Sequence, residues 1–326
     1  MTKAAIIGTG HFLPDNVVTN HDLAKEFATS DEWIQKRTGI KQRRFVDFDK
    51  EPMGASDLGT RAAANAIESA GLQKEDIDLI IYATLSPDLG FPGDGVLVQA
   101  KLDMPVGVPA LDIRNQCSGF LYGLSVANAM IASHGADNVL VVGAEAHSAA
   151  LDFTTRGRTV ASLFGDGAGA VILEAAAPAD DWGVLSSVLH TDGRYRDILY
   201  VDGGPSETGT VGHVRMKGQD VFKHAVEKLS SALDEALTKA GKTPDDIDWL
   251  VPHQANLRII NGMQKKLGMD PEKVVRTVSE HANTSAASIP LALTAAVRDG
   301  RIQSGHVLAF EAIGGGLSWG ASIVRF

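Results

Sequence analysis

The sequence of 326 residues contains a single cysteine, Cys117. One thiol excludes a disulfide within the chain and fits a reducing compartment. Positive charge is also scarce, because 30 lysines and arginines against 40 aspartates and glutamates give a net charge of −10. This excludes a basic field over the whole molecule that could hold nucleic acid. Apolar runs fall short of the roughly 18 residues that a membrane helix needs, and Gly8 interrupts the N-terminus too early for a signal peptide. We therefore expect a soluble, cytoplasmic protein without nucleic-acid or membrane partners.

What is present instead is an internal repeat. Residues 70–82, AGLQKEDIDLIIY, align without a gap with residues 240–252, AGKTPDDIDWLVP. Two further pairs of similar segments follow in the same order along the chain: 138–145 with 306–311, and 169–173 with 320–324. Apolar runs that alternate with helical patterns predict an α/β fold. The repeat predicts two copies of one α/β unit, residues 1–175 and 176–326.

Polar residues stand where predicted strands end. Cys117 lies between the strand-like run 109–113 and the helix-like run 121–131. In the second half, His253 follows the repeated strand in PHQAN, and Asn283 precedes a helical pattern in HANTSAAS. Sites in packed α/β sheets form at strand ends, and a pseudo-twofold relation between the halves would bring these ends together. We expect the cysteine, histidine and asparagine to form one catalytic site.

The three residue types permit two chemistries. A thiol is a modest nucleophile at neutral pH, but the N–H groups and the dipole at a helix N-terminus favour its thiolate form. A Cys–His–Asn set suits a papain-like protease, in which histidine deprotonates the thiol and asparagine orients the histidine. It also suits decarboxylative condensation, in which histidine and asparagine both donate hydrogen bonds to a developing enolate. The duplicated α/β architecture favours condensation.

Glycine-rich segments give weaker indications. GTGHFLP (8–14) lacks the third glycine of a dinucleotide fingerprint. GDGAGA (165–170) leads into a strand pattern, so a tight turn with close backbone packing is expected there instead of a phosphate site. IGGGLSWG (313–320) suits either a hairpin turn or an oxyanion hole made of glycine amides. The histidines lack the spacing of a zinc site, and we predict no metal.

Six motifs in order along the chain carry a specific resemblance. They are TSDEWIQKRTGI (29–40), CSGF (117–120), GDGAGA (165–170), PHQAN (252–256), NTSAAS (283–288) and GGGLSWG (314–320). With these motifs the sequence resembles the thiolase superfamily over its full length, and within it the β-ketoacyl-acyl-carrier-protein synthase III family. The resemblance implies a thiolase-like duplicated fold in five layers, α-β-α-β-α, and a homodimer.

The resemblance also implies a reaction. Cys117 would attack an acyl-CoA thioester, keep the acyl group and release CoA, after which malonyl-acyl-carrier protein would bind and lose CO₂. His253 and Asn283 would stabilise the resulting enolate, and the backbone amides of Cys117 and Gly315 would form the oxyanion hole. CoA thioesters enter as substrates, and no cofactor is implied. Two alternatives stay open: an acyltransferase or secondary-metabolic condensing enzyme with a different acceptor, and a structural paralogue without activity.

Contacts to CoA follow from the same resemblance. Trp33 and Arg37 match the pair that holds the adenine of CoA. Arg158 matches a second arginine near the adenine, and Arg156 lies close enough to be the alternative. The remaining matches are to positions of the pantetheine tunnel or the nucleotide: Thr29, Gly218, Phe222, Ala255 and Asn256.

Other matches concern macromolecular partners. Arg258 and Lys223 match basic residues at the tunnel mouth that meet the acidic carrier protein. With Lys265 and Lys266 they form either a local basic patch or a solvated helix face. Phe91, followed by proline, matches a loop that closes the acyl pocket of the opposite subunit.

Three segments leave the acyl group of the primer undetermined. His281 and Ala282 stand where an aromatic residue and glycine are common, and residues 114–116, Arg-Asn-Gln, stand where small alanines are common. The polar, glycine-rich segment 193–217 is expected to form a mobile cap over the acyl pocket. His281 either faces the site and titrates near neutrality, or packs against the neighbouring chain or the cap and changes the pocket shape. We favour the second alternative and a primer longer than acetyl.

Overall fold

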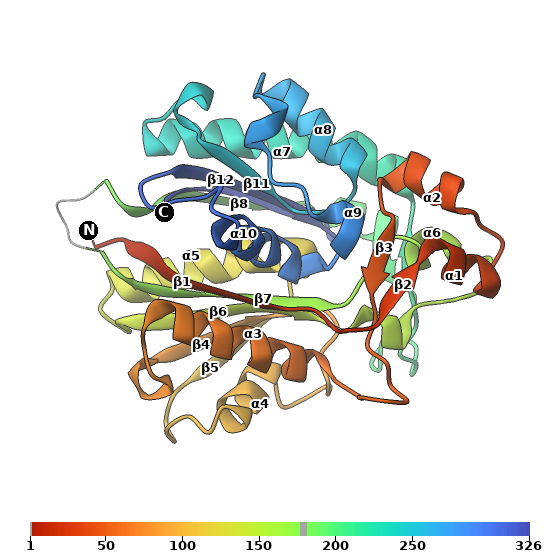
Figure 1. Ribbon diagram of the computed structural model, residues 1–326, viewed down its shortest axis with the longest axis horizontal. Coiled ribbons are helices and arrows are strands. Elements are labelled where there is room, and N and C mark those ends of the chain that lie inside the picture. Colours follow the sequence, from red (N-terminus) through yellow and green to blue (C-terminus); the bar gives the residue numbers. More distant parts are fainter. Residues whose placement is uncertain (1, 177–180) are drawn as a thin grey trace.

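The computed structural model describes residues 2–176 and 181–326. Two β-sheets form its centre, with helices between and outside them (Figure 1). The first sheet has the order β1-β7-β6-β4-β5, with bounds Ala4–Phe12, Gly167–Ala175, Asn138–Glu145, Leu79–Ala83 and Ala110–Ile113. The second has the order β11-β12-β13-β8, with bounds Trp249–Pro252, Val307–Gly314, Ser318–Arg325 and Gly183–Thr191. In each sheet one edge pair is parallel: β4 with β5 in the first sheet, and β11 with β12 in the second.

Helices cover both sheets on the outside and fill the space between them (Figure 1). The outer face of the first sheet is covered by α3 (Ala55–Ala70) and α4 (Asp94–Lys101), and that of the second by α7 (Gly218–Ala240) and α8 (Leu257–Lys266). Between the sheets lie α5 (Gly119–Ala132) and α10 (Ser288–Arg298). The five-layered α-β-α-β-α prediction is confirmed.

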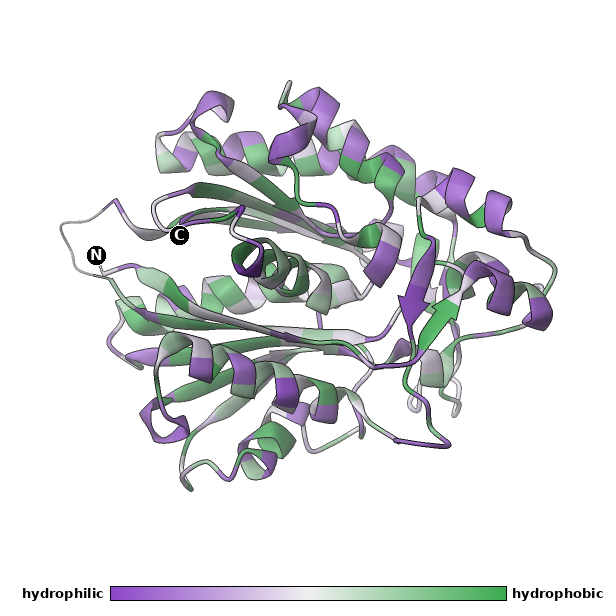
Figure 2. Ribbon diagram, in the orientation of Figure 1, coloured by the Kyte–Doolittle hydropathy of each residue, from purple (hydrophilic) through white to green (hydrophobic). Residues whose placement is uncertain are grey.

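Hydropathy explains which helices are central. Every residue of α10 from Ser288 to Thr294 is buried, so this helix packs on all sides. In α7 the buried apolar residues recur at helical spacing on one face, at 225, 229, 232, 233, 236 and 237. Figure 2 shows the same contrast between the central and the outer helices. A helix that is apolar on every side is stable only between other layers, whereas a one-sided helix covers a sheet.

Shorter elements complete the described chain. Beside the sheets lie α1 (Asn20–Glu26), α2 (Asp31–Thr38), α6 (Arg158–Ala161) and α9 (Val278–His281). Two small hairpin-like sheets pair β2 (Val17–Thr19) with β3 (Gln42–Arg44), and β9 (Leu199–Val201) with β10 (Val214–Met216). Within the described residues, no helix has the length and apolarity needed to cross a membrane.

The sequence repeat corresponds to a repeated structural unit. Both α3 and α7 end at a left-handed glycine, Gly71 with φ 70° and Gly241 with φ 65°. A short 3₁₀ turn follows in each half, and the carboxylate of Asp76 or Asp246 caps it before β4 or β11 begins. Glycine adopts this conformation without the steric cost of a Cβ atom. The division of the chain into duplicated halves at residue 175 stays a prediction.

The GDGAGA motif brings the first sheet close to the central layer. A Cβ atom at Gly169, in β7, would lie 2.5 Å from the backbone nitrogen of Leu291 in α10. Asp166 accepts hydrogen bonds from the backbone N–H groups of Val46 and Ser148. The expected close backbone packing is therefore present, and it seats the N-terminal end of α10 against the first sheet.

Candidate active site

Cys117, His253 and Asn283 meet around the segment that precedes α10. Cys117 lies in a 3₁₀ turn between β5 and α5, and His253 directly follows β11. The hydroxyl of Ser285 lies beside the Cys117 thiol, and Ser288 Oγ lies 2.5 Å from His253 Nδ1. Because the same segment begins with Asn283, it brings the three polar side chains of the sequence analysis into one neighbourhood.

The thiol of Cys117 is buried, with 4% of the residue exposed. Burial raises the pKa of this thiol to about 12. The start of α5 was expected to favour the thiolate, but burial has the larger effect, because desolvation of the charge outweighs what the helix end offers. A Cβ atom at Gly314 would lie 2.9 Å from Cys117 N, and Gly315 lines the same cavity as the thiol. The turn between β12 and β13 thus adjoins the nucleophile.

The imidazole of His253 is neutral, and Ser288 contacts one of its two nitrogens, Nδ1. Burial lowers its pKa to about 3. Ser288 Oγ accepts the N–H of Gln254 at 3.3 Å, and its other neighbour is His253 Nδ1. Since the hydroxyl proton needs an acceptor, we assign Nδ1 as the acceptor and Nε2 as the protonated nitrogen. In this tautomer His253 offers a hydrogen-bond donor and no charge.

The amide of Asn283 is oriented by the backbone. Its Oδ1 accepts the N–H of Ser285 at 2.8 Å. The backbone of Asn283 is fixed on both sides, donating to Leu163 O and accepting from Gly165 N, each at 3.0 Å. With the oxygen engaged, the Nδ2 group is left as the donor, which matches the role that an enolate-stabilising amide needs.

Two buried carboxyl groups next to the site were missed in the sequence analysis. Glu145 is fully buried at the end of β6 and accepts hydrogen bonds from Thr84 Oγ1, Ser86 Oγ and the N–H groups of Leu85, Ser86 and Ala286. Burial raises its pKa to about 7, and that of Glu311 to about 8. The signal was a charged residue in an apolar strand run, at its end for Glu145 and within it for Glu311, which is unusual unless the charge is paired or neutralised.

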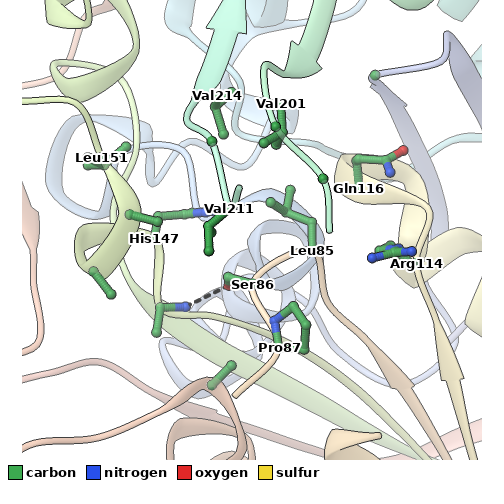
Figure 3. A pocket seen from close by; sticks show the side chains of 18 of the residues that line it. Leu85, Ser86, Pro87, Arg114, Gln116, His147, Leu151, Val201, Val211 and Val214 are labelled. Carbon is green, nitrogen blue, oxygen red and sulfur yellow. Dashed lines mark hydrogen bonds between the residues drawn. The ribbon is translucent and has the colours of Figure 1, made fainter. Parts of the chain in front are cut away.

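A cavity of about 1440 Å³ opens at Cys117. Its walls come from residues 85–90, 114–117, 146–151 and 199–214, with Gly315 beside the thiol. Figure 3 shows Leu85, Val201 and Val211 among the side chains that line it. Residues of the segment 193–217 therefore line the cavity, with β9 and β10 paired inside the segment. Its role as a cap over the acyl pocket and its mobility stay predictions.

The predicted adenine contacts form one cluster. The guanidinium carbon of Arg37 lies 4.2 Å from the centre of the Trp33 ring, and that of Arg158 lies 4.9 Å from it. Arg156 points elsewhere, with its guanidinium 3.4 Å from the carboxylate of Asp202. Of the two arginines that the sequence left open, Arg158 is the one beside Trp33.

The other predicted CoA positions lie on neighbouring elements. Arg258 on α8 lies 5.0 Å from the Phe222 ring on α7, and Asn256 caps α8 through its Oδ1. Trp33, Phe222 and Ala255 pack on the same apolar cluster, Gly218 begins α7, and Thr29 Oγ1 is buried without a partner among the described residues. Their contacts with CoA stay predictions.

Basic and apolar side chains of the predicted partner surfaces are exposed. Lys223, Arg258, Lys265 and Lys266 lie on the surface of α7 and α8. Phe91 is 89% exposed in the loop after β4. Contacts with a carrier protein and with a second subunit stay predictions.

The first alternative for His281, a residue that faces the site and titrates near neutrality, is wrong. The residue does not lie in an extended segment, because it ends the short helix α9. It is absent from the walls of the described cavity, and the groups whose charge acts on it are His11 and Arg44. Burial and these neighbours lower its pKa to about 4. His281 belongs to the packing between α9, β1 and β3.

The fold and the grouped cysteine, histidine and asparagine define a condensing enzyme of the thiolase type. Residues 111–193 match the family model of 3-oxoacyl-[acyl-carrier-protein (ACP)] synthase III, and residues 237–326 match the model of its C-terminal part. The chain is 54% identical over 326 residues to a β-ketoacyl-[acyl-carrier-protein] synthase III from Sphingopyxis alaskensis, and both chains are covered completely. A relative from Rhodospirillum rubrum with the same name is 53% identical over 328 aligned residues, with 100% of both chains covered.

Solved structures agree with the sequence comparison. The crystal structure of 3-oxoacyl-[acyl-carrier-protein] synthase III from Aquifex aeolicus superposes with a TM-score of 0.92 at 43% identity. The match covers 99% of this chain and 100% of that one. The chain therefore belongs to the β-ketoacyl-acyl-carrier-protein synthase III family.

Proposed function

We propose that this chain condenses an acyl-CoA primer with malonyl-acyl-carrier protein, the step that initiates fatty-acid synthesis. The products are 3-oxoacyl-acyl-carrier protein, CO₂ and CoA. The observation that carries the proposal is the arrangement at the cavity: the chain's single thiol, with the neutral His253 and the oriented amide of Asn283 beside it. The proposal is supported by sequence identities of 54% and 53%, over the full length of the chain, to relatives named for this activity.

The first half-reaction places the acyl group on Cys117. The sulfur attacks the thioester carbon of the primer, and the bond to the CoA sulfur breaks. Since burial raises the pKa of the thiol to about 12, deprotonation has to accompany attack, and the proton leaves with CoA. In this proposal the backbone N–H groups of Cys117 and Gly315 bind the oxyanion of the tetrahedral intermediate.

The second half-reaction uses His253 and Asn283 as donors. His253 Nε2–H and Asn283 Nδ2–H bind the thioester oxygen of the malonyl group, and the electron pair of the breaking C–CO₂ bond moves into the enolate. The enolate carbon attacks the acyl-cysteine, and Cys117 leaves as the thiolate. His253 suits this role, because its Nε2–H donates a hydrogen bond, while its lowered pKa and the contact of Nδ1 with Ser288 make it a weak base.

The test is intact-mass measurement of the acyl-enzyme. Mixing with an acyl-CoA should add one acyl mass to the wild-type chain and none to Cys117→Ser. Adding malonyl-acyl-carrier protein should then restore the original mass and yield the 3-oxoacyl product. No adduct with any of a panel of acyl-CoAs would contradict the proposal and favour an inactive paralogue.

The molecule that accepts the acyl group from Cys117 distinguishes the proposed function from its nearest alternative. An acyl-enzyme that forms normally but persists in the presence of malonyl-acyl-carrier protein would indicate an acyltransferase or condensing enzyme with another acceptor. The homodimer, the cytoplasmic location and the use of CoA thioesters without a cofactor belong to the same proposal and rest on the family resemblance.

A further inference from the structure

The wall of the cavity beside Cys117 carries an unusual set of polar side chains. Arg114 and Gln116 precede the nucleophile in the chain and line the cavity, and His147 lines it from the turn after β6. Figure 3 shows Arg114 and Gln116 in one part of the view and His147 in another, with Leu85 and Val211 drawn between them. A pocket for a plain alkyl chain needs none of these groups.

Arg114 is the charged group of this wall that lacks a counter-ion. The other charged residues of the lining are engaged: Asp88 with the Ser56 hydroxyl and Arg196 with Asp197. Within residues 2–176 and 181–326, Arg114 forms no ion pair or side-chain hydrogen bond with another residue. Arg114 is exposed and directly follows the edge strand β5. A solvent-accessible arginine without a partner binds a carboxylate readily, because its planar fork fits two oxygens.

His147 and Gln116 add neutral polar atoms. His147 is 3% exposed, and its Nε2 has no hydrogen-bond partner among the described residues. Burial lowers its pKa to about 3, so it contributes a polar nitrogen and no charge. Gln116 lies at φ 47°, an uncommon conformation for a residue other than glycine, and no partner within the described chain engages its amide. Buried polar atoms are costly unless a ligand or neighbour satisfies them.

We propose that the primer of this enzyme is a short dicarboxylic acyl-CoA whose distal carboxylate binds Arg114, with Gln116 as a further donor. The proposal rests on the condensation proposed above and names its substrate class. Arg114 lies three positions before Cys117, so their backbones lie within about 10 Å, which suits an acyl chain of roughly four to six carbons. The chemistry is unchanged: the Cys117 sulfur displaces CoA at the thioester carbon, and the distal carboxylate takes no part.

The experiment compares succinyl-CoA with butyryl-CoA, which have equal chain length and differ in the terminal group. Intact-mass measurement gives the rate of Cys117 acylation with each substrate, and the succinyl-to-butyryl ratio of these rates is compared between variants. We expect the wild type to prefer succinyl-CoA at least tenfold. Arg114→Ala should lower the succinyl-to-butyryl ratio at least tenfold, and Arg114→Lys should lower it less, because it keeps the charge without the fork. Arg196→Ala, at a lining arginine that is already paired, is the matched control and should leave the ratio unchanged.

The outcomes separate this inference from the proposed function. Acylation by butyryl-CoA and turnover with malonyl-acyl-carrier protein, without a preference for succinyl-CoA, would overturn the carboxylate assignment and leave the condensation standing. A preference that survives in Arg114→Ala would overturn the role of Arg114. Failure of every acyl-CoA to label Cys117 would overturn both proposals.

Discussion

His253 Nδ1 and Ser288 Oγ lie 2.5 Å apart in the folded chain although 35 positions separate them in the sequence. Ser288 begins α10, the buried helix between the two sheets. The hydroxyl therefore comes from the most enclosed layer of the molecule, and it fixes which nitrogen of His253 carries the proton. Orientation of a catalytic imidazole by a neighbouring group is a general requirement of such sites.

The first prediction concerns this contact. Ser288→Ala should lower the rate of malonyl decarboxylation by about tenfold, because one hydrogen bond that selects the Nε2–H tautomer is lost. Acylation of Cys117 should change much less. Release of ¹⁴CO₂ from labelled malonyl-acyl-carrier protein measures the first rate, and intact mass measures the second. Ser187→Ala, which removes a hydroxyl of the second sheet bonded to Ser322, is the control. Equal losses in both half-reactions would show that Ser288 acts only on packing.

The second prediction assigns the amide of Asn283. Asn283→Ala should reduce decarboxylation by about 10² to 10³-fold, the usual effect of removing one oxyanion donor, and should leave Cys117 acylation largely intact. The same two assays apply. If acylation were lost while decarboxylation continued, the asparagine would be acting on the nucleophile as in a papain-like protease.

Much of this site could be predicted because its residues mark strand ends. Cys117 and His253 follow parallel strands. The sequence repeat therefore predicted that these two residues lie close together in the folded chain. The thiol pKa could not be foreseen, since it depends on how completely the surrounding layers exclude water. Glu145 was missed for a similar reason, because four of its five donors come from residues 84–86 and the fifth comes from Ala286, and both segments are far from Glu145 in the chain. His281 was misjudged because a four-residue helix, α9, has too few positions to show a period.

The third prediction tests whether Glu145 stabilises the fold as the buried hydrogen-bond acceptor for residues 84–86. Glu145→Leu should lower the free energy of unfolding by about 2 to 4 kcal/mol, because the N–H and O–H groups of residues 84–86 lose their buried acceptor. Glu145→Gln keeps one acceptor oxygen and should cost less. Urea denaturation gives both values. Glu174→Leu, at an exposed glutamate of β7, should stay within about 0.5 kcal/mol of the wild type. A Glu145→Leu variant as stable as the wild type would show that these hydrogen bonds do not stabilise the fold.

The fourth prediction separates two neighbouring arginines. Arg158→Ala should raise KM for acyl-CoA by about three- to tenfold with little change in kcat, because a cation beside an aromatic ring contributes about 0.5 to 2 kcal/mol. Arg156→Ala is the matched control, since Arg156 is largely exposed and pairs with Asp202. Steady-state kinetics with varied acyl-CoA measures both. A larger effect from Arg156 would reverse the assignment.

His281 and His11 share a partly buried position that is unfavourable for positive charge. The Nδ1 atoms of both rings are buried without a partner among the described residues. Burial, the charge of His11 and the charge of Arg44 lower the pKa of His281 from its usual value near 6.5 to about 4. Burial and Arg298 lower that of His11 to about 4 as well. Both groups therefore bind protons more tightly in the unfolded chain than in the folded one.

The last prediction follows from the sign of that difference. A histidine whose pKa is lowered by folding contributes stability that is fully present above about pH 6.5 and is lost as the pH falls toward 4. Between pH 7.5 and 5.0, the wild type should lose about 1 to 2 kcal/mol more unfolding free energy than His281→Phe, which has no group to protonate there. Urea denaturation of both proteins at the two pH values measures the difference, and any pH-independent effect of the phenylalanine cancels. His21→Gln, at an exposed histidine of α1, should lose as much stability as the wild type. Identical pH dependence in the wild type and His281→Phe would mean that His281 titrates alike in the folded and unfolded chains, and would remove it as a source of acid sensitivity.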